Sequence, residues 1–245
     1  MGKPFLSVII PAFNEARRLP MTLIDIDRYL ADQEFSYEIL VVDDGSTDNT
    51  SEIVNRFSAM IKNLKLLPNS GNIGVGSAVK IGMLAGKGNW RLALDAGNSI
   101  SVREFGKVMP ILSNENNFGI VIASRAEKRT VFNPPPKSWR RISEAVVNYF
   151  TRKLLGSKVR DFLLGFQCFS SEAAEKIFSL IKLKSWSYSQ EALVLGEKIG
   201  FNIKEIQVAG SRDDDGHFPP FGYLQMLLDA ARIWWWLKRG KYELT

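Results

Sequence analysis

Short apolar runs alternate with amphipathic stretches along the first half of the chain. The apolar runs have the length of strands and occupy residues 5–12, 37–43, 64–67, 90–94 and 119–123. Between them the spacing of apolar residues is helical, and we expect helices at 14–30, from about 46 to 61, from 74 to about 86 and at 101–112. This alternation predicts an α/β fold with a mostly parallel sheet flanked by helices.

The regular alternation of strand and helix patterns ends after residue 124. Asn133-Pro134-Pro135-Pro136 can form neither a helix nor a central strand and predicts a surface loop. Beyond it the pattern predicts a loop leading into a short strand within 161–169, a strand at 201–208, and helices at 137–155, 171–181, 186–198 and 221–239. Because no flexible linker separates the two parts, we expect a single domain over 1–245, with halves at 1–125 and 126–245.

Composition and charge narrow the class of protein. Hydrophobic residues make up 45% of the 245 positions, which is enough for a sizeable core, and a single cysteine, Cys168, fits a reducing compartment. No apolar stretch approaches the roughly 18–20 residues that span a bilayer. The formal charge of +6 admits nucleic acid, anionic lipid or phosphorylated ligands as partners. No nucleic-acid-binding module is recognisable, so we expect no nucleic-acid partner. The single cysteine leads us to expect a cytoplasmic protein.

Polar residues follow the first two predicted strands at the point where each strand ends. Asn14 and Glu15 come after the first strand, and Asp43 and Asp44 close the second. The carboxyl ends of neighbouring parallel strands are where open α/β sheets bind ligands. The acidic residues therefore predict a binding site at this edge, although they also suit the starts of the helices that follow.

These motifs, together with the glycine-rich turn over residues 72–82, resemble the nucleotide-sugar-binding half of family 2 glycosyltransferases, enzymes with the GT-A fold. Carboxylates suit such a pocket because they accept hydrogen bonds from a base imide or from ribose hydroxyls. Glycines let the backbone approach a ligand closely at a helix start. The resemblance implies that the donor is bound by Pro11, Ala12, Asn14, Glu15, Asp43, Asp44, Gly74 and Gly76.

Asp95-Ala96-Gly97 stands at the position of the family's Asp-x-Asp motif. Paired carboxylates there normally hold Mg²⁺ or Mn²⁺, which bridges the donor diphosphate. In this chain Gly97 replaces the second aspartate, so the resemblance leaves Asp95, with Asn98 and His217 as candidate additional ligands. Three interpretations stay open: an enzyme with reduced metal demand, an inactivated enzyme, and a silent sugar-nucleotide-binding protein.

The segment that ends in Ser124-Arg125 resembles polyprenyl-phosphate glycosyltransferases, which move glucose or mannose onto dolichyl or undecaprenyl phosphate. A phosphate acceptor is already ionised and needs orientation and charge balance rather than a base. The resemblance therefore implies catalytic roles for Asp95, Arg125, Arg140 and Arg141. Ser189 stands where the resembled family usually has an aspartate, a departure that concerns the acceptor side. If the acceptor is instead a hydroxyl, Asp161 or Glu191 is the best base available.

Two predicted helices carry apolar stripes beside basic residues. The helix after residue 137 places Ile142, Val146 and Phe150 near one face, and the last helix contains Trp234-Trp235-Trp236. Tryptophan and basic residues beside an apolar stripe suit a bilayer interface. We expect peripheral contact with the cytoplasmic face of a membrane, with a homodimer interface as the alternative.

The sequence thus predicts an inverting glycosyltransferase that moves a hexose, with UDP-glucose as the expected donor, to a polyprenyl phosphate. One alternative is a family 2 transferase that acts on a glycan or lipid hydroxyl. The other is a binding protein that has lost its metal chemistry at Gly97.

Overall fold

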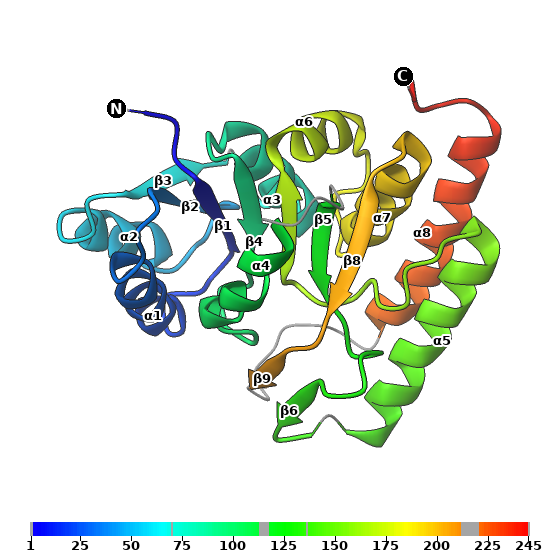
Figure 1. The fold of residues 1–245 in the computed structure, drawn as a ribbon, viewed down its shortest axis with the longest axis horizontal. Helices are drawn as coiled ribbons and strands as arrows, with labels where there is room; N and C mark the ends of the chain where they lie inside the picture. Colours follow the sequence, from blue (N-terminus) through cyan, green and yellow to red (C-terminus); the bar gives the residue numbers. More distant parts are fainter. Residues whose placement is uncertain (1, 70, 113–117, 136, 212–220, 245) are drawn as a thin grey trace.

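The computed structural model describes residues 2–69, 71–112, 118–135, 137–211 and 221–244. Their central element is a seven-stranded sheet in the order β3-β2-β1-β4-β7-β5-β8 (Figure 1). The strands are β1 (Leu6–Ala12), β2 (Tyr37–Asp43), β3 (Leu64–Pro68), β4 (Trp90–Ala93), β5 (Phe118–Ala123), β7 (Gln167–Ser170) and β8 (Asn202–Ile206). The neighbours pair in parallel except for β7, which runs antiparallel to both β4 and β5. The predicted α/β fold with a mostly parallel sheet is confirmed.

Helices cover both faces of the sheet because its central strands are apolar on both sides. The helices are α1 (Leu19–Ala31), α2 (Thr50–Ser58), α3 (Val75–Ala85), α4 (Met109–Leu112), α6 (Ser171–Leu180) and α7 (Tyr188–Ile199). On β1, Val8 and Ile10 pack into a core with α1 and α2, whereas Ile9 between them packs into a second core with α3, α6 and α7. Alternate residues of one strand therefore join opposite layers.

Two long helices, α5 (Ser138–Leu155) and α8 (Phe221–Lys238), pack side by side at one end of the sheet (Figure 1). A small parallel sheet of β6 (Val131–Asn133) and β9 (Ala209–Ser211) lies near them. Within the described residues, no helix is both long and apolar enough to cross a membrane. The second half of the chain thus adds strands β7 and β8 to the main sheet and an outer pair of helices.

Some predicted boundaries were wrong. The helix predicted over 101–112 is a 3₁₀ segment, Val102–Lys107, followed by the short α4. Pro110 explains the break, because proline has no backbone N–H to donate to the carbonyl four residues earlier in a continuous helix. The first helix begins at Leu19 rather than Asn14, which adopts a positive φ of 55° and belongs to a loop. Strands β6 and β9 were not predicted, because short exposed strands show little alternation of apolar and polar residues.

Candidate active site

A cavity of about 570 Å³ opens where β1, β2 and β4 end. Its walls include Pro11 and Ala12 at the end of β1, Asp44 after β2 and Asp95 after β4. The second half of the chain closes it with residues from α5, α7, α8 and the loop before β7. These are Arg140, Glu144, Phe162, Leu163, Leu164, Gly165, Tyr188, Ser189, Tyr223 and Met226. The site predicted from the strand ends therefore forms one cavity with the predicted acceptor half.

Asp44 connects the second strand to the glycine-rich turn. Its carboxylate accepts hydrogen bonds from the backbone N–H groups of Gly74 (2.7 Å) and Ile73 (3.1 Å), and from the side chain of Asn69 (2.8 Å). A side chain at Gly74 would collide with the carbonyl of Lys184, so the close approach of these segments requires glycine. Asp44 and Gly74 both line the cavity, and their binding of the donor stays a prediction.

Asp43, in contrast, shapes the loop rather than the cavity wall. Its carboxylate accepts from the N–H (3.0 Å) and hydroxyl (2.5 Å) of Ser46 and also from the hydroxyl of Ser51. Asn14 holds the same loop through Thr47 N–H (2.8 Å), and Asn14 itself lines the cavity. Asp43 is not among the lining residues. The structure therefore places Asp43 one layer behind the site.

Gly76 also lies outside the cavity lining. Its N–H donates to the carbonyl of Lys184 at 2.8 Å, and an added Cβ would sit 2.7 Å from the carbonyl oxygen of Leu183. This glycine therefore allows the start of α3 to pack on the 183–185 segment. That packing brings Ser185 and Trp186 to the cavity rim, where both are lining residues.

Glu15 pairs with an arginine that the sequence analysis did not single out. Its carboxylate accepts from Nε of Arg18 at 2.8 Å and also from Nη2. The side chains of Glu15 and Arg18 are 11% and 20% exposed, and both residues line the cavity. The Arg-Arg-Leu-Pro stretch around Arg18 gave no signal, because it resembles an ordinary solvated helix start.

Asp95 projects from the end of β4 into the cavity wall. Its carboxylate accepts from the hydroxyl (2.7 Å) and N–H (3.2 Å) of Ser99. Burial raises the pKa of the Tyr188 hydroxyl above its ordinary value, and the negative charge of Asp95 adds to this rise. The Tyr188 hydroxyl therefore stays protonated near neutral pH.

The other candidate metal ligands are not gathered around Asp95 in the described part of the chain. Asn98 donates to Asp25 at 3.0 Å, and its Oδ1 is buried without a partner but does not line the cavity. His217 lies outside the described residues. No group of three or more His, Cys, Asp or Glu suited to a metal occurs among the described residues. These residues do not fit a divalent cation held by protein ligands alone.

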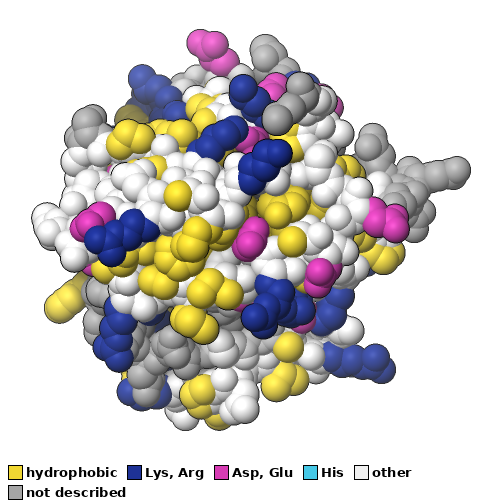
Figure 2. Space-filling model, turned by 90° about the vertical axis from the view of Figure 1, so that its left-hand side faces the viewer, with side chains coloured by type: hydrophobic (Ala, Val, Ile, Leu, Met, Phe, Trp, Pro, Cys, Tyr) yellow, Lys and Arg dark blue, Asp and Glu magenta, His cyan; other side chains and the backbone are white. Residues whose placement is uncertain are grey.

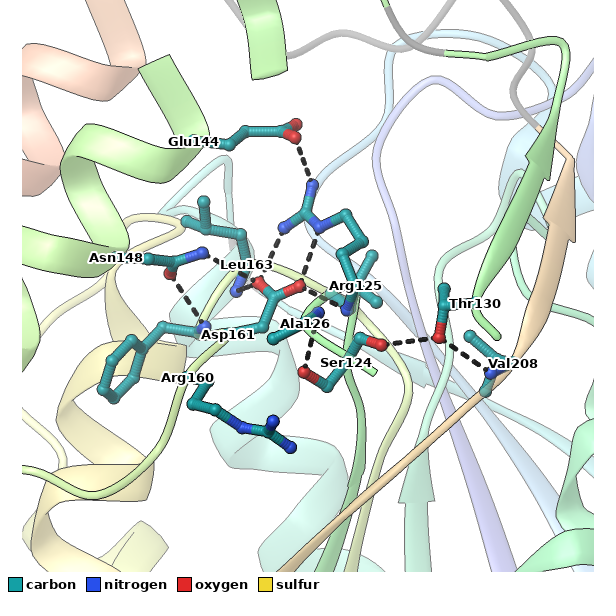
Figure 3. A network of polar contacts seen from close by, with 12 residues as sticks. Ser124, Arg125, Ala126, Thr130, Glu144, Asn148, Arg160, Asp161, Leu163 and Val208 are labelled. Atoms are coloured by element: carbon teal, nitrogen blue, oxygen red, sulfur yellow. Dashed lines mark hydrogen bonds and ion pairs between the residues drawn. The ribbon is translucent and has the colours of Figure 1, made fainter. Parts of the chain in front are cut away.

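Arg125 is fixed in a buried network of ion pairs (Figure 3). Its guanidinium donates to Asp161 through Nε (2.7 Å) and Nη2 (2.8 Å), and Nη1 lies 2.6 Å from a carboxylate oxygen of Glu144. Burial alone would raise the pKa of Asp161, but the charge and hydrogen bonds of Arg125 outweigh it and hold this pKa below its ordinary value. Arg125 lines the cavity, with its charge already balanced by two carboxylates, and its catalytic role stays a prediction.

The two predicted arginines of α5 differ in position. Arg140 lines the cavity, where its Nε donates to the hydroxyl of Tyr223 at 3.3 Å. Arg141 is exposed and is not among the lining residues. The structure therefore brings Arg140, and not Arg141, to the site. Adjacent residues on a helix point about 100° apart, so no sequence pattern alone could choose between them.

Neither of the bases considered for a hydroxyl acceptor lines the cavity. Asp161 is 2% exposed and paired with Arg125. Glu191 is fully buried, accepts from the N–H groups of Lys182 and Leu183, and lies outside the lining set. Burial raises the pKa of Glu191 above its ordinary value. Ser189 does line the cavity, but its hydroxyl donates to the carbonyl of Phe162 at 2.5 Å.

Comparison with known proteins places this geometry in context. Residues 7–178 match the family model described as glycosyl transferase family 2. A dolichyl-phosphate beta-glucosyltransferase of Dictyostelium discoideum is 33% identical over 94% of this chain and 73% of its own length. The Homo sapiens protein of the same name is 27% identical, over 96% and 72%.

Solved structures resemble the fold at lower identity. Glucosyl-3-phosphoglycerate synthase from Mycobacterium tuberculosis, solved with Mn²⁺ and UDP-glucose, has a TM-score of 0.65 and 17% identity, covering 94% of this chain and 77% of that one. S. aureus TarS has a TM-score of 0.56 and 18% identity, covering 93% and 64%. At this identity the likeness supports the shared fold.

Proposed function

The chain belongs to glycosyltransferase family 2, and we propose that it moves glucose from UDP-glucose to the phosphate of a polyprenyl phosphate of the dolichyl type, with inversion at the anomeric carbon. The observation that carries this proposal is the composition of the cavity. The same space is lined by Asp44 and Asp95 at the strand ends and by Arg140 and Tyr223 of the two outer helices. A donor and a phosphate acceptor can therefore meet there.

The donor half of the proposal concerns residues 1–125. Pro11, Asn14 and Asp44 form the wall at the ends of the first two strands, where backbone and carboxylate oxygens suit the base and ribose of a nucleoside. The named relatives are glucosyltransferases, and a structural neighbour was solved with UDP-glucose. These similarities support UDP-glucose as the donor. In this proposal residues 126–245 form the acceptor side.

The chemistry of the lining residues favours a phosphate acceptor over a hydroxyl. A phosphomonoester carries its nucleophilic charge near neutral pH, so no base is required. An acceptor oxygen bonds to the anomeric carbon while the bond from that carbon to the β-phosphate oxygen breaks, and the electron pair leaves with UDP. Arg140 balances and orients the incoming phosphate. The buried Asp161 holds Arg125 in place instead of acting as a base.

The outer helices suit an acceptor whose lipid chain stays in a bilayer. On α5, Ile142 (66%), Val146 (51%) and Tyr149 (65%) are exposed, and on α8, Leu224 (57%) and Leu228 (52%) are exposed. Lys238 and Arg239 follow beside tryptophans at the end of α8, as is common at membrane interfaces. On the opposite end, around α1 and α2, basic, acidic and hydrophobic side chains are interspersed (Figure 2). We place the α5–α8 face on the membrane, and a homodimer through that face is the competing outcome.

The proposal is tested with a panel of acceptors. UDP-glucose labelled in the glucose is incubated with a short polyprenyl phosphate, the matching polyprenol and 3-phosphoglycerate, and the transferred label is counted. We expect transfer to the polyprenyl phosphate alone. Transfer to the polyprenol would favour the hydroxyl-acceptor alternative. Tight UDP binding without transfer to any of these would identify a silent binding protein.

A further inference from the structure

The arginine paired with Glu15 fills the space beside the missing second carboxylate. An ideal Cβ placed on Gly97 would lie 2.8 Å from Nη1 of Arg18 and 3.3 Å from Oδ2 of Asp95. The guanidinium end of Arg18 thus lies against Gly97 and close to Asp95. A cationic group stands where a second aspartate side chain would otherwise project.

The position of Arg18 is fixed from several sides. Glu15 accepts from its Nε and Nη2 atoms, which directs the Nη1 end toward Gly97. The backbone N–H of Arg18 donates to the carbonyl of Glu15 at 3.0 Å. On the next turn, the hydroxyl of Thr22 donates to the carbonyl of Ala96 at 2.7 Å, which ties α1 to the loop that carries Gly97. Arg18 is therefore a preorganised cation and not a mobile surface side chain.

The positions of the positively charged side chains around the cavity also single out Arg18. Among the described residues, the cationic side chains that line it are Arg18, Arg125 and Arg140. Arg125, in the loop after β5, is held by Asp161 and Glu144, and Arg140 lies on α5 in the acceptor half. Arg18 is the cation that adjoins Asp95, where the family motif normally places the donor diphosphate.

We infer that Arg18 supplies the positive charge that binds the diphosphate of the nucleotide donor, in place of a divalent cation held by paired carboxylates. A guanidinium suits this task because its planar array of N–H groups matches phosphate oxygens and keeps its charge at every physiological pH. Gly97 fits the same arrangement, since an aspartate there would compete with the diphosphate for Arg18. The inference rests on the proposed donor and predicts nucleotide binding that needs no metal.

Calorimetric titration with UDP tests this directly. The wild-type protein is titrated in EDTA and again in Mn²⁺, followed by the variants R18Q and R18K under both conditions. R17Q is the matched control, because Arg17 is the neighbouring arginine, is exposed and is not among the lining residues. Thermal melts of all variants establish that each is folded. If R18Q proves unstable, R18K takes its place in the test, because it keeps the positive charge but lacks the planar guanidinium.

We expect wild-type UDP affinity to be the same in EDTA and in Mn²⁺. R18Q should weaken it by about 10- to 100-fold, the range for a lost charged hydrogen bond, with R18K intermediate and R17Q unchanged. The inference fails, and the proposed function stands, if wild-type binding requires Mn²⁺ and R18Q binds as well as wild type. Absence of UDP binding by folded wild-type protein under both conditions would overturn the proposed function and this inference together.

Discussion

The side chain of Arg125, which lines the cavity, forms a bidentate ion pair with the buried Asp161, with N–O distances of 2.7 and 2.8 Å. Asp161 also accepts the backbone N–H of Arg125 at 2.9 Å, so one carboxylate fixes both the main chain and the side chain after β5. Asn148 of α5 donates to the same carboxylate at 3.3 Å (Figure 3). The pair thus connects the end of the sheet with the outer helices.

Replacing Asp161 with asparagine should destabilise the protein in a pH-dependent way. Breaking a buried ion pair costs about 3 kcal/mol, because Arg125 loses one of the two carboxylates that balance its charge. The folded-state pKa of Asp161 lies below the unfolded value, so its contribution is complete above about pH 4 and is lost as the pH falls through the folded pKa. Unfolding free energies of wild type and D161N should therefore converge toward low pH.

Urea unfolding measured from neutral to acidic pH checks this prediction. E52Q is the control, because Glu52 forms an exposed pair with Arg56 and should contribute less than about 1 kcal/mol. A constant difference between wild type and D161N at all pH values would show that the charge of Asp161 is not what stabilises the fold.

The two neighbouring arginines of α5 give a matched test of the acceptor site. Arg140 lines the cavity and Arg141 is exposed. R140Q should lower kcat/KM for the polyprenyl phosphate by about tenfold or more, the effect of removing a charged hydrogen bond to phosphate. R141Q should have a smaller effect. Steady-state kinetics at saturating UDP-glucose separate the two, and an equal loss in both variants would assign the effect to general attraction of the lipid phosphate.

Restoring the family carboxylate at Gly97 should not by itself create a metal site. The new side chain of G97D would meet the guanidinium of Arg18 and pair with it. We expect G97D alone to gain little Mn²⁺ affinity, and the double variant G97D/R18Q to gain about tenfold or more, because the competing cation is gone. Electron paramagnetic resonance of free Mn²⁺ measures this. A strong gain in G97D alone would mean that Arg18 does not occupy the site.

The exposed apolar face of α5 and α8 should control binding to membranes. The double variant I142S/L224S removes side chains that are 66% and 57% exposed, so it should fold normally and lose about tenfold or more in vesicle binding. M21S/M60S is the control, since Met21 and Met60 are 70% and 72% exposed in the region of α1 and α2. Flotation with phosphatidylcholine–phosphatidylglycerol vesicles measures binding. Loss of a dimer in I142S/L224S without loss of flotation would reassign the face to self-association.

The sequence predicted the sheet well because its central strands are nearly continuous apolar runs, such as 37–43, flanked by clear turns. Those turns also place polar groups where parallel strands end, so Asp44, Glu15 and Asp95 were predicted at the edge where the cavity lies. Such patterns depend only on residues that are close together in the sequence, so they can be recognised without the structure.

The remaining features depend on contacts between distant segments, which no local pattern encodes. Asp43 and Asp44 are adjacent aspartates, yet of the two only Asp44 binds the backbone of the glycine-rich turn and lines the cavity. Arg18 belongs to the site only because α1 packs against the loop that carries Gly97. Pairing of Arg125 with Asp161 joins residues 36 positions apart.

The most direct test follows the fate of glucose and UDP in one reaction. Purified protein is incubated with UDP-glucose and a polyprenyl phosphate in vesicles, while UDP release and lipid-linked glucose are measured together and the product is examined by NMR. The account predicts one lipid-linked glucose for each UDP released, in the β configuration. UDP release without lipid-linked glucose, or an α-linked product, would contradict it.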